Sequence, residues 1–172
     1  MAVKTILTEP NKILRQTSKL VDQVGNEEQK LMDDMLDTMY AANGIGLAAI
    51  QIGIPKRIIV MDLSKEKEKK EPMYFVNPII KNKNALKSTY EEGCLSVPNQ
   101  FAEIDRPSKC EVEYLDYNGE KKILMADGLL ATCIQHEMDH LEGILFIDYL
   151  SKLKRSMIVK KLSKLKSNTA IL

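Results

Sequence analysis

The sequence predicts an α+β fold in which small antiparallel or mixed β-sheets pack around a central helix, with further helices toward the N- and C-terminal ends. Three segments carry a helical pattern of apolar residues, and most of the strand-like runs lie between the first two of them. The strict alternation of strands and helices that is typical of a doubly wound parallel sheet is missing. With 172 residues, the chain is long enough for one domain with its own core.

The first predicted helix begins near Asn26, which we expect to be its N-cap, and carries Glu27 and Glu28 in its first turn. We expect Asn43 and Gly44 to end it, because both residues tolerate the backbone that follows a helix. The apolar positions between these ends recur at helical spacing and indicate a buried face: Leu31, Met32, Met35, Leu36, Met39 and Tyr40.

Short strands are predicted between the first and second helices, because β-branched and aromatic residues cluster there in short runs. A run of mixed charge over 64–72 separates the first two strands and is interpreted as an exposed hairpin loop. An Asn118-Gly119 turn joins the last two. The predicted strands cover 57–63, 73–80, 88–90, 109–115 and 121–125.

A second helix is predicted from about 127 to 142, with Gly143 placed to stop it. The apolar run 144–150 reads as a short strand, and the segment that follows reads as a third helix. We therefore expect a single catalytic domain over 1–150 and a basic C-terminal helix or tail over 151–172.

Composition excludes several classes of protein. The chain has 25 basic and 24 acidic residues, so its net charge of +1 provides no general attraction to nucleic acid or to a membrane surface. No run approaches the length of a membrane span, and the first residues do not resemble a signal peptide. The three cysteines do not resemble a disulfide framework. We therefore expect a cytoplasmic protein that does not enter a membrane.

Both histidines of the chain lie in one pentapeptide, His136-Glu137-Met138-Asp139-His140, on the second predicted helix. Positions i and i+4 share a helix face, so both imidazoles can reach one metal ion. Glu137 can then act as general base toward a water on that ion. The alternative, two surface histidines, would require both to flank a glutamate in register by chance. The sequence therefore predicts that the central helix binds a metal.

A catalytic metal needs about three protein ligands and an open position, so a third ligand is missing from the pentapeptide. Metallopeptidases often supply a histidine downstream, but Phe146 stands at that position here. Glu142 is too close in sequence to fold back easily, and Asp148 lies in an apolar run. A cysteine thiolate is therefore the best candidate for the third ligand.

Cys94 is the favoured cysteine, because it lies in Glu91-Glu92-Gly93-Cys94-Leu95-Ser96, where Gly93 allows close approach of the backbone. The other two cysteines fit structural roles. Cys133 lies within an apolar helical run, and Cys110 lies in the middle of a predicted strand.

The segment 44–51 (GIGLAAIQ) superficially resembles a dinucleotide-binding fingerprint, with Asp62 as the ribose-binding acid. The context argues against this, because the segment follows a helix and leaves no room for a helix before the next strand. We expect a tight loop in which Gly44 and Gly46 adopt positive φ. Gln51 at its end offers an amide that could donate to a developing oxyanion.

Three motifs together, GIGLAAIQ, EGCLS and HEMDH, resemble the signature motifs of peptide deformylases in order and separation. The resemblance spans nearly the whole chain, and the C-terminal helix and uninterrupted EGCLS resemble the bacterial type I branch. It implies hydrolysis of the N-formyl group from the N-terminal methionine of newly synthesised polypeptides, with release of formate.

The resemblance also implies roles for individual residues. One divalent ion would be held by Cys94, His136 and His140; Fe²⁺ is usual in the family, and Zn²⁺, Ni²⁺ or Co²⁺ can replace it. A water bound to the metal would be the nucleophile, with Glu137 as general base and then acid. The side chain of Gln51 and the backbone N–H of Leu95 would stabilise the oxyanion.

Substrate binding is implied at two places. The backbone of Ile45, Gly46 and Gly93 would pair with the peptide, as a strand does. The methionine pocket would be formed by Ile45, Glu92, Leu129, Cys133 and His136. We also expect Asp139 to pair with Arg106. One position departs from the family, since many relatives carry arginine where this chain has Phe101.

The tail is strongly basic and contains no acidic residue. The resemblance implies docking on ribosomal RNA, whereas the simpler interpretation is a solvated helix face. We expect the chain to act as a monomer. Three other functions stay open at this point: a metalloendopeptidase, a cysteine hydrolase that uses Cys94, and a non-catalytic metal-stabilised module bound to the ribosome. The basic residues of the tail are Lys152, Lys154, Arg155, Lys160, Lys161, Lys164 and Lys166.

Overall fold

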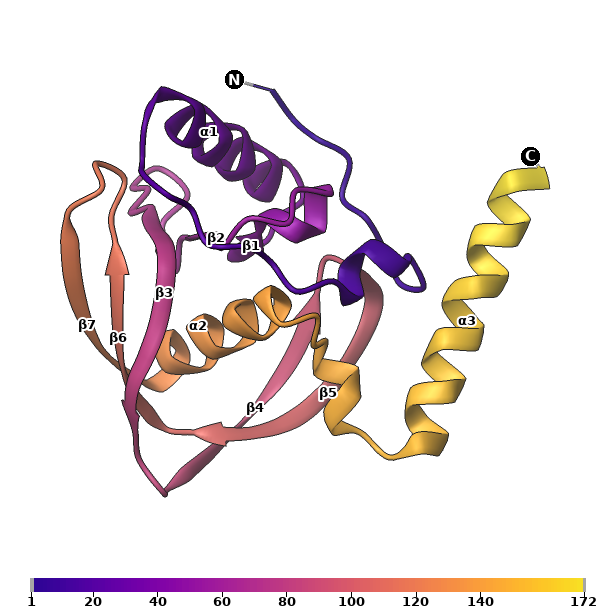
Figure 1. The fold of residues 1–172 in the computed structure, drawn as a ribbon. Helices are drawn as coiled ribbons and strands as arrows, with labels where there is room; N and C mark the ends of the chain where they lie inside the picture. The colour runs from indigo at the N-terminus through magenta and orange to yellow at the C-terminus, as the bar shows by residue number, and fades with distance from the viewer. Residues whose placement is uncertain (1, 172) are drawn as a thin grey trace.

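The computed structural model describes the backbone of residues 2–171 and the side chains as far as residue 165. Three α-helices and seven strands follow one another along the chain (Figure 1). Their bounds are α1 Asn26–Ala41, β1 Gly46–Ala48, β2 Ile58–Met61, β3 Met73–Lys83, β4 Lys87–Cys94, β5 Val97–Pro107, β6 Lys109–Leu115, β7 Lys121–Asp127, α2 Gly128–Leu141 and α3 Lys152–Ile171.

The strands form two sheets. Five of them pair in the order β1-β2-β3-β6-β7, and β4 pairs with β5 in a separate hairpin. Every pairing between these strands is antiparallel, which excludes the dinucleotide-binding interpretation of 44–51. Figure 1 shows α2 between the five-stranded sheet and the β4–β5 hairpin, with α3 at the side of the hairpin. The predicted α+β fold with a central helix is confirmed.

The core holds α2 in place from one side. Ile134 and Leu141 of α2 are fully buried in a cluster with Phe75 and Val112 of the large sheet. The methionine stripe of α1 forms part of a second cluster beneath β1 and β2, as the helical spacing predicts. Because the apolar face of α2 is anchored in this way, its other face is fixed toward β4.

The ends of α1 differ from the prediction. Gly25 is the N-cap and Asn26 is the first helical residue, because the carboxylate of Glu28 accepts a hydrogen bond from the backbone N–H of Gly25, 3.1 Å away. The helix ends at Ala41, two residues before Asn43, which adopts a left-handed φ of 57°.

The apolar run 144–150 is not a strand. Phe146–Tyr149 forms a 3₁₀ turn. Its N-cap residue is Leu145, whose backbone N–H donates a hydrogen bond to Asp148 at 3.1 Å. Leu145, Phe146 and Ile147 are all buried against β5 and α3. Consecutive buried residues such as Leu145, Phe146 and Ile147 have no period from which their conformation could be predicted.

Strand β5 was not predicted, and β4 is longer than the predicted 88–90. Pro98 and Pro107 make β5 look unlike a strand. Both prolines lie near the ends of β5, whose only strand neighbour in the described chain is β4, so few N–H groups of the ladder are lost. This hairpin carries Cys94 at the end of β4.

The charged run 64–72 is the exposed loop between β2 and β3, as predicted. Asp62 has a structural role at its base, since it accepts hydrogen bonds from the backbone of Ser64 at 2.8 Å and Glu71 at 3.0 Å. Within residues 2–171, no helix has the length and apolar character needed to cross a membrane.

Candidate metal and catalytic site

Cys94, His136 and His140 meet where the end of β4 faces α2. Their ligand atoms all lie within 4.8 Å of one another, and Cys94 Sγ is 3.4 Å from His140 Nε2. Both histidines are buried, whereas Cys94 is partly exposed. Among the described residues this is the one group of three histidine, cysteine or acidic side chains with such geometry.

The other candidates for a third ligand lie away from this cluster. Glu142 forms an ion pair with Arg57 at 2.8 Å, and Asp148 forms one with Arg15 at 2.6 Å. Burial, with the nearby charge of Glu137, raises the pKa of the Cys133 thiol to about 12, so this cysteine stays protonated.

The ligand set fits a divalent transition metal. A thiolate with two imidazoles suits zinc or iron, and three protein ligands leave a fourth position for water or substrate. Burial lowers the pKa of His140 well below its ordinary value, which favours the neutral imidazole that a metal requires. The free carboxylate oxygen of Glu137 beside this cluster is the partner that a water at the fourth position would need.

A buried network orients His136. Its Nδ1 lies 2.8 Å from Glu92 Oε1, which leaves Nε2 to face the cluster. Arg106 donates two hydrogen bonds to Glu92, at 2.7 and 3.0 Å, and a third to Asp139 at 2.8 Å. Tyr149 donates to the same oxygen of Asp139. The predicted pairing of Asp139 with Arg106 is therefore present, within a larger network.

This network keeps Glu92 ionised. Burial opposes its charge, but the hydrogen bonds from His136 and Arg106 outweigh burial and lower the pKa of Glu92 below its ordinary value. Hydrogen bonds with Cys94 and Glu92 outweigh burial and raise the pKa of His136 well above its ordinary value. A metal must therefore displace the proton of Nε2 when it binds, while Glu92 keeps the proton on Nδ1 and so fixes the tautomer.

We expect Glu92→Gln to weaken metal binding about 10- to 100-fold, because a neutral amide holds this tautomer less firmly. Competition with a chromogenic chelator would measure the change in metal affinity. Glu103→Gln, on exposed surface of β5, is the matched control and should leave the affinity unchanged. Wild-type affinity in Glu92→Gln would contradict the orienting role.

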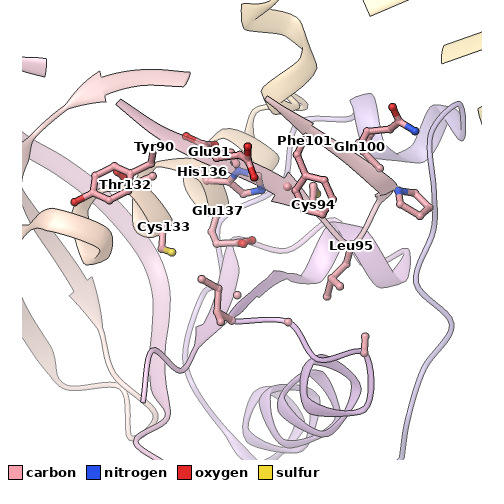
Figure 2. A pocket seen from close by; sticks show the side chains of 18 of the residues that line it. Tyr90, Glu91, Cys94, Leu95, Gln100, Phe101, Thr132, Cys133, His136 and Glu137 are labelled. Carbon is pink, nitrogen blue, oxygen red and sulfur yellow. Dashed lines mark hydrogen bonds and ion pairs between the residues drawn. The ribbon is translucent and has the colours of Figure 1, made fainter. Parts of the chain in front are cut away.

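Glu137 points from α2 into the adjoining cavity (Figure 2). Its Oε2 is buried and has no hydrogen-bond partner among the described residues. Burial, together with the charge of Glu92, raises the pKa of Glu137 to about 7. A carboxyl group with a pKa near neutrality can both accept and return a proton.

Two glycines allow close packing around this carboxylate. A Cβ atom at Gly46 would lie 2.5 Å from Glu137 Oε1, and one at Gly44 would lie 2.6 Å from the side chain of Leu95. Neither glycine has positive φ, so that expectation was wrong. The residues are needed for close approach of β1 to α2 and to the turn that follows Cys94.

Gln51 lies beside the cluster, on the 3₁₀ turn Ala49–Ile52. Its Oε1 accepts a hydrogen bond from Ala48 N at 2.9 Å, which orients the amide. Its Nε2 therefore faces Ser96 Oγ at 3.0 Å and Cys94 Sγ at 3.6 Å. A donor fixed at this place can stabilise negative charge that develops next to Cys94.

A cavity of about 510 Å³ opens beside these residues (Figure 2). Its walls include the sequence-predicted residues from all three motifs: Gln51, Ile45, Gly46, Glu92, Gly93, Cys94, Leu95, Leu129, Cys133, His136 and Glu137. His140 is behind them, buried beneath Cys94. Most of the exposed wall area is apolar, as a pocket for methionine requires.

Sequence reasoning missed the role of Ser96 and the contact of Arg106 with Glu92, although it predicted the pairing of Arg106 with Asp139. Ser96 accepts the hydrogen bond of Gln51, and Arg106 holds Glu92 as well as Asp139. The signal for the second was available, because a ligand histidine usually pairs with a carboxylate, and a buried carboxylate needs a cation. Ser96 belongs to the EGCLS motif, but the motif alone did not indicate its contact with Gln51.

Comparisons with known proteins identify the family that this chain resembles. The family model described as polypeptide deformylase matches residues 3–156. A peptide deformylase of Pelagibacter ubique is 78% identical over 171 residues, covering 99% of each chain. A crystal structure of peptide deformylase from Ehrlichia chaffeensis superimposes with a TM-score of 0.93 at 43% identity, over 99% of this chain and 100% of that one. A structure of the Ehrlichia enzyme with actinonin has a TM-score of 0.91 at 46% identity, over 95% and 98%.

Proposed function

The chain belongs to the peptide deformylase family, whose members are metal-dependent hydrolases that remove N-formyl groups from nascent peptides. We propose that this chain catalyses the same reaction in the cavity beside Cys94 and α2. The observation that carries the proposal is the cluster of Cys94, His136 and His140 next to the buried, unpartnered carboxylate oxygen of Glu137. These three residues would hold the metal.

When bound by Cys94, His136 and His140, a metal ion would supply Lewis-acid chemistry that makes a water molecule acidic. Glu137 accepts the proton of that water and then passes it to the amine that leaves. The tetrahedral oxyanion receives hydrogen bonds from Gln51 Nε2 and from the backbone N–H of Leu95. The contacts of Gln51 with Ala48 and Ser96 hold its amide in this orientation beforehand.

The peptide lies as an added strand between the backbone of Ile45 and Gly46 on one side and that of Gly93 on the other. Its methionine side chain enters the apolar part of the cavity. The walls there are Ile45, the stem of Glu92, Leu129, Cys133 and His136. Many relatives carry arginine at the position of Phe101, which offers no charge to the peptide. The contacts that β5 makes with peptide residues after the methionine are therefore apolar.

We propose Fe²⁺ as the physiological ion, with Zn²⁺, Ni²⁺ or Co²⁺ able to replace it, and one ion per chain. The support is the mixed thiolate and imidazole set, which suits these ions better than Mg²⁺ or Ca²⁺. We also propose that the protein acts as a monomer. The three cysteines are free and the substrates are nascent chains, so we place the protein in the cytoplasm.

We expect the protein to release formate from formyl-Met-Ala-Ser, to lose this activity with a chelator, and to regain it when Fe²⁺, Co²⁺ or Zn²⁺ is restored. A cysteine hydrolase would withstand the chelator. A metalloendopeptidase would cut internal bonds instead, and a binding module would release no formate. Formate assays with parallel metal analysis separate these cases, and no formate from the metal-loaded protein would overturn the proposal.

We propose a catalytic domain over 1–150 and a basic C-terminal helix that docks on ribosomal RNA. The helix is α3, and its described basic side chains run from Lys152 to Lys164. Lys166 lies outside the described side chains. If phosphate contacts dominate, the affinity for ribosomes falls steeply between about 50 and 200 mM salt.

We expect truncation after Ser151 to reduce ribosome binding at least 10-fold and to change deformylation of formyl-Met-Ala-Ser much less. Sedimentation with ribosomes over a salt series would measure the binding. Since α3 covers apolar residues of β5, the variant's thermal unfolding is measured alongside. Ribosome binding that survives in a folded truncated protein would contradict the docking role.

A further inference from the structure

A second hollow lies between α3 and β5, next to the cavity described above. Ile158, Val159 and Leu162 attach the helix to the body, in a cluster with Val97 and Ile104 of β5. Beside this contact the two elements leave a groove of about 810 Å³ between the helix and residues 100–103. We name it the α3 groove.

The walls of the α3 groove combine apolar surface with positive charge. Lys154, Lys160, Lys161 and Lys164 line it, and Glu103 is the one acidic residue of its lining. None of these lysines takes part in an ion pair within the described part of the chain. The apolar lining consists of Phe101, Ala102, Leu150, Met157 and Ile158.

The α3 groove adjoins the catalytic cavity. Gln100 and Phe101 line both of them. Figure 2 shows both residues at the side of the cavity near Cys94. Phe101 pairs with Gly93 across the hairpin, and a Cβ atom at Gly93 would lie 2.6 Å from its ring. A chain that leaves the cavity past Gly93 therefore crosses Phe101, which is 66% exposed, and meets the groove.

We propose that the α3 groove binds the part of the formylated peptide that follows its first residues, and that it favours segments carrying carboxylates. The inference rests on the proposed function, because the peptide must first enter the catalytic cavity. Each extended residue adds about 3.3 Å, so a peptide of eight residues spans roughly 26 Å and reaches well beyond the methionine pocket. Lysine ammonium groups then face the carboxylates of the peptide. Phe101 and Met157 offer apolar surface to the aliphatic parts of the same acidic side chains.

A peptide fits this groove better than nucleic acid does. The groove lysines are exposed, so RNA phosphates can contact them too, but the apolar floor beneath them and the adjoining catalytic cavity favour a peptide. Both occupants would use the same lysines, so the experiment must separate them.

The test compares three substrates at low salt with the metal-loaded protein. The first is formyl-Met-Ala-Ser, which is too short to reach far into the groove. The second continues it as Ala-Glu-Asp-Glu-Ala, and the third as Ala-Gln-Asn-Gln-Ala, which matches the second in shape without its charge. The groove variant is Lys161→Gln with Lys164→Gln, and the control of equal charge loss is Lys30→Gln with Lys121→Gln, on α1 and β7.

We expect the wild-type protein to prefer the acidic peptide about 5- to 10-fold in kcat/KM, mainly through KM, from two or three exposed ion pairs. The preference should fall below 2-fold in the groove variant, persist in the control and weaken with added salt. All three proteins should process formyl-Met-Ala-Ser equally. Failure with this short substrate would therefore contradict the proposed deformylase function, whereas the preference between the two long peptides tests the groove.

Equal kcat/KM for the acidic and amide peptides in the wild type would overturn the inference. A preference that persists in the groove variant would do the same, because other residues would then supply it. If the groove variant loses ribosome binding but handles every peptide as the wild type does, the lysines serve RNA and the inference fails.

Discussion

Replacement of Glu137 by glutamine is expected to lower kcat/KM for formyl-Met-Ala-Ser by about 10²–10⁴-fold while the protein keeps one metal ion per chain. The amide has the shape of the carboxylate and preserves the close contact with Gly46, but it cannot accept the proton of water. Formate release and metal analysis on the same preparation would measure both quantities.

The control for this prediction is Glu91→Gln, which removes a carboxylate from the rim of the same cavity. Because Glu91 is exposed and is not assigned a role in proton transfer, its variant should stay within about 2-fold of the wild type. Near-normal turnover in Glu137→Gln would remove Glu137 from the mechanism and would leave the function of its unpartnered oxygen unexplained.

Replacement of Cys94 by alanine is expected to abolish tight metal binding and with it deformylation. The two imidazoles on α2 supply only two of the three ligands that the metal needs. The acidic residues that could take the place of the thiolate, Glu142 and Asp148, pair with arginines elsewhere. Metal content after dialysis is the direct measurement, and circular dichroism would confirm that the variant is folded.

The matched controls are the other two cysteines. Cys110→Ala and Cys133→Ala should each keep one metal ion per chain, because neither sulfur belongs to the cluster. Cys133 lines the cavity in which we propose that methionine binds, so its variant should change KM more than metal content. One tightly bound ion in Cys94→Ala would show that the third ligand lies elsewhere in the chain.

The helices and most strands could be predicted because their signals are local. The methionine stripe of α1 and the Asn118-Gly119 turn each reside in a few neighbouring residues, and the structure bears them out. Strand β5 and the turn at 146–149 could not be predicted in this way. Their conformations depend on partners distant in sequence, namely β4 for the first and the packing of β5 and α3 for the second.

The candidate site, like the fold, could be predicted from the sequence only in part. The spacing of His136 and His140 sets their common helix face, and the scarcity of histidine directs the search for a third ligand to the cysteines. Their meeting with Cys94, across 42 and 46 positions, depends on how β4 packs against α2. The assignment of these three residues as ligands stays a prediction, which the cysteine variants test.

The sequence by itself determined the family, the α+β class and the residue types available for chemistry, because motifs and periodicity are properties of neighbouring positions. Only the tertiary structure decided that Arg106 holds Glu92 against His136, that Gly46 serves close approach to Glu137, and that α3 and β5 form a basic groove beside the cavity. The physical reason is that packing joins side chains from separate elements, and the free energy of each such contact depends on where the folded chain places both partners.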